Sequence, residues 1–482
     1  MIRGLIIAGL VLGVALSCAS EPGPTSTSTP PSVPATGISS TATPQDSSRP
    51  NLPAPSVIAP VSTNTAGSTA SPSPSVSPAS PPPPSSPGAL VLSVAESLGL
   101  ADPGLRAAVE DLRGLVGGDP GPVEVLRLEA VTWRDSSLGC PQPEMFYAQV
   151  LTAGLWLVLA HQDQEYDYRV VGGRAVRCVQ GDTSEPLERQ PVRGIWTRLA
   201  GLPTPRGEVA AAELNGKIYV LGGFGGGATA NEEYDVAAGT WQTRAPIPRG
   251  VDHPAAVAVG GKLYLIGGFN GRWGPLADVW AYDPEGDTWT QKAGLPTPRG
   301  ALGSVVVDGK IYAIGGVSAS GDVGTTEVYD PATDSWSARS PMPSVRDHIA
   351  VAESQGMIYV AGGRFGSFAR NLDANQAYDP RLDTWAELAP LPTPRSGNTA
   401  AAAAGRIFVF GGESTEGTFD ANEAYDPGNN TWTAMPPMPT ARHGLAAVAL
   451  NNRVYVLAGG PQVGGSVSSL NEVFILLPGT SE

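Results

Sequence analysis

Arginines recur at corresponding positions in the C-terminal part of this sequence, within Pro-Thr-Pro-Arg or a related motif. Each stands 16 residues before the first position of a pair of small residues, which is Gly-Gly in all but the last case. They are Arg206, Arg299, Arg346, Arg395 and Arg442. Guanidinium groups bind planar carboxylates through paired hydrogen bonds. If these arginines surround one opening, we expect at least two of them to contact an acidic ligand.

A structural role for the same arginines is the alternative. Glutamates recur two residues before an aromatic residue in this part of the chain: Glu232, Glu327, Glu423 and Glu472. Such carboxylates would bind the arginines in structural ion pairs. The sequence leaves both interpretations open.

Aromatic and basic residues mix in the segments that follow the small-residue pairs. They include Phe224, Phe269, Arg272, Trp273, Arg364, Phe365, Phe368, Arg370 and Phe419. This mixture is typical of contact surfaces, and an exposed ring beside an arginine suits a sugar that carries an acid group. We predict that Trp273, Arg364 and Arg370 contact the ligand. The alternative is that these side chains fold back onto their own loops.

Three of the four histidines stand near the start of equivalent predicted strands, namely His253, His348 and His443. That recurrence suggests metal ligands. However, His443 is offset by one residue from the other two, and one residue turns a side chain to the other face of a strand. We therefore predict no metal site.

Six copies of a repeat position all of these residues. Each copy has a small-residue pair, followed by an aromatic residue and, in all but the last copy, a tryptophan. The pairs begin at Gly222, Gly267, Gly315, Gly362, Gly411 and Ala458, and the aromatic residues are Tyr234, Tyr282, Tyr329, Tyr378, Tyr425 and Phe474. The tryptophans, counting one that precedes the first copy, are Trp196, Trp241, Trp289, Trp336, Trp385 and Trp432. A period in the high forties built of short strands indicates a β-propeller.

The double glycine, Tyr-Asp and tryptophan at these offsets resemble the kelch motif, over about residues 195–476. The resemblance implies blades of four antiparallel strands around a central channel. Kelch-like copper-radical oxidases use a cysteine cross-linked to a tyrosine, and no cysteine follows Cys178, so we expect no such cofactor. The array also resembles exported six-bladed sialic-acid mutarotases, for which Glu413 and the arginines would serve as site residues.

The register of the repeat predicts how the ring closes. The array begins with an isolated strand around Trp196 and ends one strand short, at Phe474. We therefore expect the Trp196 strand to complete the sixth blade and to leave no free terminal edge. Because neighbouring strands run in opposite directions, the loops between second and third strands and the corners between blades share one face, around one mouth of the channel.

The first 18 residues predict export. A mostly apolar run from Leu5 to Leu16 is too short to span a bilayer comfortably. The sequence Ala-Leu-Ser-Cys that ends at Cys18 resembles the lipobox of bacterial lipoproteins, although Ala15 replaces the usual leucine. The resemblance implies a lipid on Cys18 and an anchor at the outer face of a bacterial membrane. An ordinary cleaved signal peptide and a secreted product are the alternative.

Composition divides the rest of the chain. Residues 19–88 are a Ser/Thr/Pro-rich stretch that we expect to be a disordered linker. Residues 89–190 predict a small α+β module, with a helix over about 105–116 capped by Asp102 and strands that include 145–151. Cys140 and Cys178 predict a disulfide within this module. Residues 191–482 form the propeller, so the predicted fold class is mainly β: a six-bladed kelch β-propeller closed by an N-terminal strand.

The charge and the surface features give the predicted function. A formal net charge of −15 argues against a nucleic-acid partner. We expect a monomer without cofactor or metal, whose only membrane contact is its lipid anchor. It would be an extracytoplasmic binding protein that presents one loop face to a protein or glycan ligand, which the arginines suggest is acidic. A carbohydrate-active enzyme, such as a mutarotase or epimerase, is the alternative.

Overall fold

The computed structural model describes residues 90–142, 144–162, 164–179 and 185–477. The predicted signal peptide, the predicted linker and Cys18 lie outside these residues. The described residues all belong to one compact unit, Pro81–Glu482. Within them, no helix has both the length and the apolar character needed to cross a membrane.

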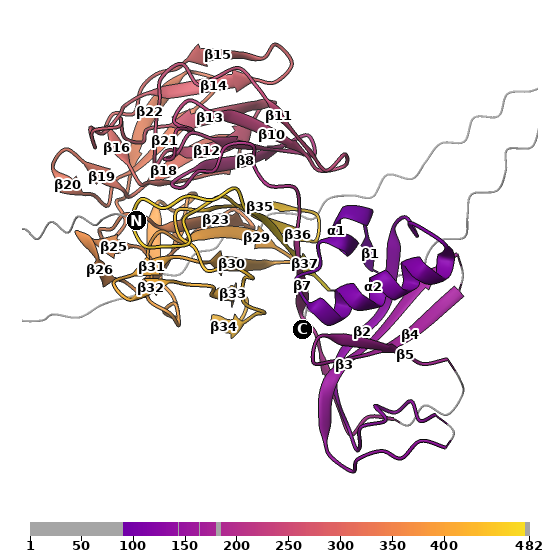
Figure 1. Ribbon diagram of the computed structural model, residues 1–482. Coiled ribbons are helices and arrows are strands. Elements are labelled where there is room, and N and C mark those ends of the chain that lie inside the picture. The colour runs from indigo at the N-terminus through magenta and orange to yellow at the C-terminus, as the bar shows by residue number, and fades with distance from the viewer. Residues whose placement is uncertain (1–89, 143, 163, 180–184, 478–482) are drawn as a thin grey trace, which may run out of the picture. The chain divides into compact units, whose positions relative to one another are not determined.

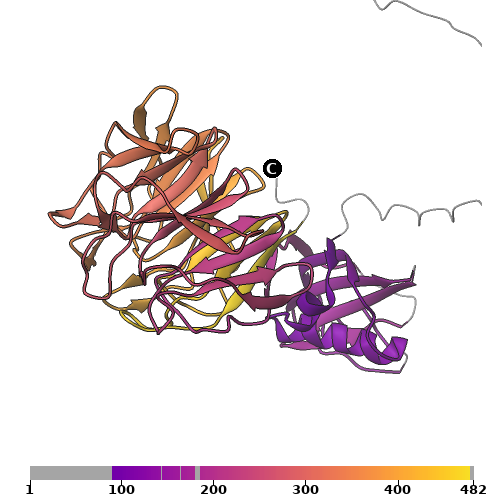
Figure 2. The ribbon, with the colours of Figure 1, turned by 90° about the horizontal axis from the view of Figure 1, so that it is seen from above.

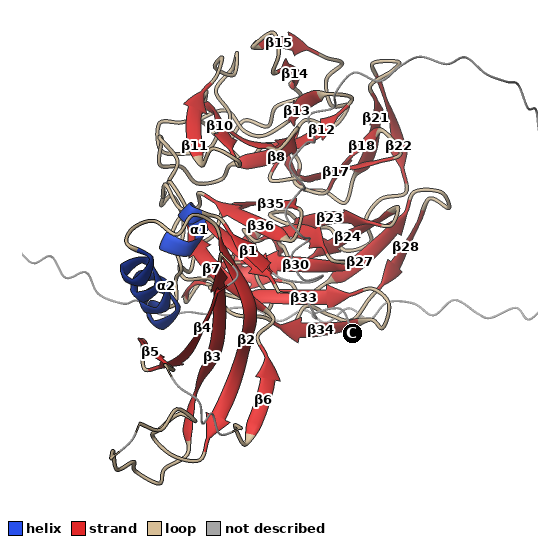
Figure 3. Ribbon diagram, turned by 90° about the vertical axis from the view of Figure 1, so that its right-hand side faces the viewer, coloured by secondary structure: helices blue, strands red, loops and turns tan. Residues whose placement is uncertain are grey.

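The first part of the described chain is a small α+β domain (Figures 1 and 3). Its elements are β1 (Leu90–Leu92), α1 (Val94–Leu98), α2 (Pro103–Val116), β2 (Val123–Trp133), β3 (Thr152–His161), β4 (Gln164–Val171), β5 (Arg174–Arg177) and β6 (Glu188–Pro191). The strands form an antiparallel sheet in the order β1-β2-β3-β4-β5, and β6 also pairs with β2. As predicted, Asp102 caps α2 by accepting hydrogen bonds from the amides of Gly104 and Leu105.

Two further predictions for this domain had different outcomes. Cys140 and Cys178 form the predicted disulfide. The strand predicted over 145–151 is wrong, because this segment is coil with an exposed Phe146 and Leu151. Its apolar residues suggested a strand, but no neighbouring strand pairs with them.

The rest of the described chain forms six sheets of four antiparallel strands. They are β8 (Ala210–Leu214), β9 (Lys217–Leu221), β10 (Asn231–Asp235) and β11 (Thr240–Thr243) in blade 1; β12 (Ala255–Val259), β13 (Lys262–Ile266), β14 (Val279–Asp283) and β15 (Thr288–Gln291) in blade 2; β17 (Gly303–Val307), β18 (Lys310–Ile314), β21 (Thr326–Asp330) and β22 (Ser335–Arg339) in blade 3. They continue with β23 (Ala350–Ser354), β24 (Met357–Ala361), β27 (Asn375–Asp379) and β28 (Thr384–Glu387) in blade 4; β29 (Thr399–Ala403), β30 (Arg406–Phe410), β33 (Asn422–Asp426) and β34 (Thr431–Ala434) in blade 5; β35 (Ala446–Leu450), β36 (Arg453–Leu457), β37 (Asn471–Leu476) and β7 (Gly194–Arg198) in blade 6.

Short strands extend the loops between the second and third strands of three blades. They are β19 (Val317–Ser318) and β20 (Gly321–Asp322) in blade 3, β25 (Arg364–Phe365) and β26 (Ser367–Asn371) in blade 4, and β31 (Glu413–Ser414) and β32 (Gly417–Thr418) in blade 5. A further short strand, β16 (Arg299–Gly300), pairs with β19. These hairpins stand on one face of the propeller.

The predicted closure of the ring is confirmed. β7 pairs with β37, so that Trp196 lies opposite Phe474 and the N-terminal strand completes the blade that the end of the chain leaves unfinished. The last blade lies beside the first, shown in yellow and magenta in Figure 2. Closure in this way protects both terminal strands from pairing with other chains.

A closed circle of backbone hydrogen bonds joins the blades at the channel. We call its six members the inner ring: Glu208, His253, Ala301, His348, Gly397 and Gly444, one from each blade. Each amide donates to the carbonyl oxygen of the ring residue in the preceding blade, and Glu208 donates to Gly444 over 2.7 Å, which closes the circle. All six have left-handed backbone conformations, with φ between 50° and 63°, which non-glycine residues rarely adopt.

The repeated tryptophans join the blades farther from the channel. The indole nitrogen of Trp289 donates to the carbonyl oxygen of Ala245 in the preceding blade over 2.9 Å. The other five tryptophans of the repeat make equivalent hydrogen bonds across each remaining blade boundary. Their structural role is therefore to fix the packing of neighbouring blades.

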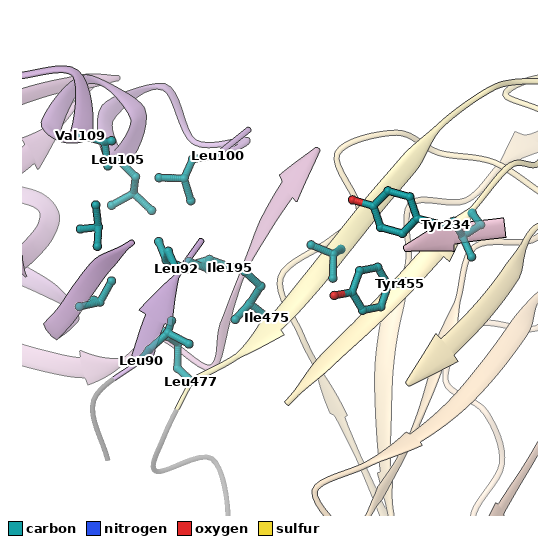
Figure 4. Packing of buried hydrophobic residues seen from close by; sticks show 14 of the residues in the cluster. Leu90, Leu92, Leu100, Leu105, Val109, Ile195, Tyr234, Tyr455, Ile475 and Leu477 are labelled. Carbon is teal, nitrogen blue, oxygen red and sulfur yellow. The ribbon is translucent and has the colours of Figure 1, made fainter. Parts of the chain in front are cut away.

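The small domain attaches to the closing strand. Leu100 pairs with Thr197 on the edge of β7 that faces away from β37, and Glu96 forms an ion pair with Arg453 of β36. Leu92 and Leu100 belong to the same apolar cluster as Ile195 and Ile475 (Figure 4). The small domain and blade 6 therefore share one core.

We predict that the inner ring is sensitive to added side-chain volume. A Cβ on Gly444 would lie 2.5 Å from a carboxylate oxygen of Glu208 and 2.9 Å from its amide nitrogen. We expect Gly444→Ala to lower the free energy of unfolding by about 2–4 kcal/mol, because crowding adds to left-handed strain. Gly309→Ala is the matched control, since Gly309 is also left-handed but has open space around it. Chemical denaturation measures both, and equal losses would contradict the prediction.

Candidate functional site

Two further sets of equivalent residues surround the inner ring. The corner residues precede the ring residues by one position: Gly207, Asp252, Gly300, Asp347, Ser396 and His443. The loop residues follow the small-residue pairs: Phe224, Phe269, Val317, Arg364, Glu413 and Gly460. In each blade the corner residue pairs with the loop residue through the backbone. The predicted sharing of one face by blade corners and loops is thus observed, and we call this face, with the inner ring at its centre, the mouth.

Glu208 joins two histidines at the mouth. One carboxylate oxygen lies 3.4 Å from Nε2 of His253, and the other lies 3.2 Å from Nδ1 of His443. The other ring nitrogen of His253, Nδ1, lies 2.8 Å from a carboxylate oxygen of Asp252. All four residues are buried, so these polar groups interact in a medium of low dielectric constant.

Arg364 organises the opposite part of the mouth. Its guanidinium donates to Asp347 over 3.1 Å and to Glu413 over 3.0 Å. It also contacts Nε2 of His348 at 2.9 Å, and Nδ1 of His348 is hydrogen bonded to Asp347. The side chain of Arg364 is only 14% exposed. These contacts are consistent with a neutral His348 that donates from Nδ1 and accepts at Nε2.

The pKa values within the mouth are shifted in opposite directions. Burial raises the pKa of Glu208, but the charge of His253 and the contact with His443 outweigh it and hold the pKa below its usual range. Burial lowers the pKa of His443, but the bond with Glu208 leaves it raised. The pKa of His348 is lowered by burial and by the charge of Arg364. Glu208 is thus ionised, and a proton is favoured on His443 over His348.

A second pair of carboxyl groups lies beside Arg364. Burial and the contact with Asp347 raise the pKa of Asp322 to about 6. Burial also raises the pKa of Asp347, but its bond with His348 leaves the pKa lowered overall. Asp322 also accepts a hydrogen bond from the amide of Gly366 over 2.6 Å. The mouth therefore holds one carboxyl group that exchanges its proton near neutral pH.

Aromatic rings form another part of the mouth. Trp273 is 61% exposed, and its ring centre lies 5.2 Å from that of His253, 5.3 Å from that of Phe269 and 6.0 Å from that of Phe224. The backbone of Trp273 is left-handed, with φ of 59°. An exposed flat ring therefore lies beside the buried polar groups.

The channel itself is narrow. The innermost strands β8, β12, β17, β23, β29 and β35 line a cavity of about 160 Å³ together with the inner ring. Its walls are mostly small residues, including Ala210, Ala255, Gly303 and Ala446. A cavity of this size holds waters or a small ion, so a larger ligand must bind at the mouth.

The five repeated arginines lie inside their own blades. Their side chains are fully buried. Arg206 donates to Glu232 over 2.6 Å, Arg299 to Glu327 over 2.5 Å and Arg346 to the side-chain oxygen of Gln376 over 2.6 Å. Arg395 and Arg442 bind Glu423 and Glu472 in the same way. These contacts are those expected if the arginines have a structural role. Direct binding of a ligand by these arginines stays a prediction and would require the blades to open.

The other predicted ligand residues are placed differently from one another. Trp273 and Arg364 lie at the mouth. Arg370, on the hairpin of β25 and β26, is exposed and packs over the ring of Phe365, 4.6 Å from its centre. The Arg370 side chain thus folds back onto its own loop, which was the alternative to contact with a ligand.

Sequence reasoning missed Glu208, Asp252, Asp347 and Asp322. One signal in the sequence could have revealed most of them. The ring and corner positions carry glycine or alanine in some blades and ionisable residues in others. His443 is a corner residue rather than a ring residue, as its offset indicated. Its side chain nevertheless reaches Glu208 of blade 1, because both residues lie at blade corners, outside the strands with alternating faces.

Comparison with known proteins identifies the propeller. A family model described as the attractin/LZTR1 β-propeller matches residues 218–463. The chain belongs to this family. A second model, a domain of unknown function (DUF8738), matches residues 105–178 of the small domain. No curated protein sequence matches the chain.

A solved structure is similar to the propeller in fold. The structure titled "Structure of YjhT" is similar over 56% of this chain and 95% of its own, with a TM-score of 0.51 and 20% sequence identity. At this identity the similarity shows the propeller fold alone.

We predict that the buried arginines support the propeller. Arg299→Met would leave the buried carboxylate of Glu327 unpaired and lower the free energy of unfolding by about 3–5 kcal/mol. Adding Glu327→Met should restore most of the loss. Arg249→Met is the control, since Arg249 is half exposed in its ion pair with Asp278 and should cost about 0–1 kcal/mol. Denaturant titration measures all three, and a stable Arg299→Met variant would contradict the structural role.

Proposed function

We propose that this protein is an exported binding protein and that its mouth binds a saccharide. The observation that carries the proposal is the exposed ring of Trp273, which lies 5.2 Å from His253 within a site that also holds Arg364 and several carboxylates. A sugar ring has apolar faces and a rim of hydroxyl groups. It would pack one face on the indole while its hydroxyl groups bind the polar side chains, which is the usual balance in small-ligand sites.

The charge at the mouth favours a neutral saccharide over an acidic one. Among the described residues, the mouth holds one arginine and four buried carboxylates: Glu208, Asp252, Asp347 and Glu413. Arg364 already binds two of them, Asp347 and Glu413. The negative charge of these carboxylates would repel a ligand carboxylate. The hydroxyl groups of a neutral saccharide would instead donate hydrogen bonds to the same carboxylates. The acidic ligand suggested by the arginine repeat is therefore not part of this proposal.

The export part of the proposal has separate support. The disulfide between Cys140 and Cys178 is of the kind that persists in oxidising compartments, and the first 18 residues have the pattern of a lipoprotein signal. We expect Cys18→Ser to release the protein from membranes into the soluble fraction. Cell fractionation with immunoblotting measures this, and a variant that stays on the membrane would exclude the lipid anchor.

We predict that Trp273 contributes strongly to saccharide binding. A glycan array probed with the full chain would first identify a ligand, and calorimetry would then compare variants. Trp273→Ala should weaken binding at least tenfold, because the exposed indole is the main apolar contact. Leu382→Ala is the control, since Leu382 is also exposed but lies in the turn between β27 and β28. Equal affinities of the Trp273→Ala variant and the wild type would refute the assigned site.

A second candidate function is interconversion of sugar anomers or epimers. The observation that favours it is Asp322, whose pKa near 6 lies beside an ionised Asp347 and a neutral His348. Such a set holds an acid and a base together. The protonated Asp322 would donate to the ring oxygen while a neighbouring group accepts the proton of the anomeric hydroxyl, so that the bond between the anomeric carbon and the ring oxygen breaks to give the open-chain carbonyl form. Reclosure on the other face, with the proton transfers reversed, gives the other anomer.

This candidate predicts a pH dependence. The acid form of Asp322 is lost as pH rises through about 6, so a rate that depends on it should fall over the same range. Asp322→Asn should lower the rate about 100-fold, whereas Asp330→Asn, at the end of β21, should leave it unchanged. NMR exchange spectroscopy on anomeric protons measures the rate. A wild type that binds sugars without accelerating exchange would leave binding as the function.

A further inference from the structure

Three buried side chains of the inner ring converge at the mouth. Glu208, His253 and His348 each place one ligand atom within 4.8 Å of the others. They come from blades 1, 2 and 4, and all three keep left-handed backbones although glycine stands at the equivalent position in blades 5 and 6. Such strain persists where the surroundings enforce it and is common at functional sites.

The two histidines are oriented by carboxylates. Asp252 binds Nδ1 of His253, and Asp347 binds Nδ1 of His348, so each imidazole directs Nε2 away from its own carboxylate. A carboxylate on the second nitrogen is the usual partner of a histidine that ligates a metal, because it fixes the tautomer and raises the basicity of the ligating nitrogen. Both carboxylates come from the same corner position, in blades 2 and 4.

The charge of the mouth lacks compensation. Among the described residues, the mouth holds four buried carboxylates, those of Glu208, Asp252, Asp347 and Glu413, and one guanidinium, that of Arg364, which binds Asp347 and Glu413. Burying unpaired carboxylates is costly, and a bound divalent cation would remove the excess.

We propose that Glu208, His253 and His348 bind a divalent transition-metal ion. Two imidazole nitrogens and one carboxylate oxygen form a ligand set that suits Zn²⁺ and leaves a coordination position open for water or a ligand. The site does not depend on saccharide binding, so either proposal can fail alone.

Arg364 competes with the metal at His348. Its guanidinium occupies Nε2 of His348 at 2.9 Å, the nitrogen that the ion requires. Metal binding therefore displaces this one contact, while Asp347 and Glu413 still hold the arginine. It follows that Arg364→Met should increase the metal affinity, because it frees the nitrogen and removes a positive charge.

Titration of the full chain with Zn²⁺ alone tests the site. A chelator competition assay should show one equivalent bound by the wild type, with at least tenfold weaker binding after His253→Ala, His348→Ala or Glu208→Gln. His161→Ala is the control, since His161 ends β3 in the small domain, and it should bind as the wild type does. The affinity for Zn²⁺ should fall as the pH is lowered through the range in which imidazole groups titrate, because protons compete with the metal for the histidine nitrogens.

A second pair of variants keeps the test valid if a ligand variant fails to fold. Asp252→Asn retains the side-chain shape and should weaken Zn²⁺ binding about 10–100-fold, and Arg364→Met should strengthen it. Circular dichroism without metal confirms that each variant is folded. Absence of a saturable equivalent in the wild type, or binding that these two variants leave unchanged, would overturn the proposal.

Discussion

The circle of six backbone hydrogen bonds at the channel is the constraint on which the propeller depends. Each bond joins neighbouring blades through residues whose φ values are all positive. Left-handed backbone costs a non-glycine residue roughly 1–2 kcal/mol, so the four non-glycine members place a strain on the fold that the closed circle and the outer tryptophan bonds must outweigh. The geometry that closes the propeller is thus also the geometry that projects Glu208, His253 and His348 toward one place.

The division between framework and site follows from this arrangement. The repeated arginines use their donors within their own blades and belong to the framework, whereas the neighbouring corner and ring positions carry different residues in different blades. Blade 3 shows the minimal form, with Gly300, Ala301 and Val317 at the three positions, and contributes no ionisable side chain there. Blades 1, 2 and 4 replace small residues with charged or imidazole groups. Chemistry can therefore change at the mouth while the packing of the blades stays the same.

The sequence predicted the fold well because the signals for it are local and periodic. The spacing of Trp196 to Trp432 gave the blades, and the incomplete last copy gave the closure by β7. The mouth was predicted only in part. Glu208 and His348 belong to different copies of the repeat and come together because the blades form a circle, so the spacing of residues within one copy does not reveal their contact. For the repeated arginines the sequence left a structural role and ligand binding open, and the ion pairs that most of them form inside their own blades are those of the structural role. The strand predicted over 145–151 failed because apolar composition does not supply a pairing partner.

The pairing of β7 with β37 also sets an order of events in folding. Arg198 and Glu472 meet across 274 residues of chain, and the entropy of closing so long a loop must be lost before this contact forms. Blades 1 to 5 are each built from consecutive strands and can assemble as the chain emerges, but blade 6 must wait for the C-terminus. Until then the core that β7 shares with the small domain is unfinished. A chain that ends before β37 would therefore lack both the partner of β7 and part of the core beneath the small domain.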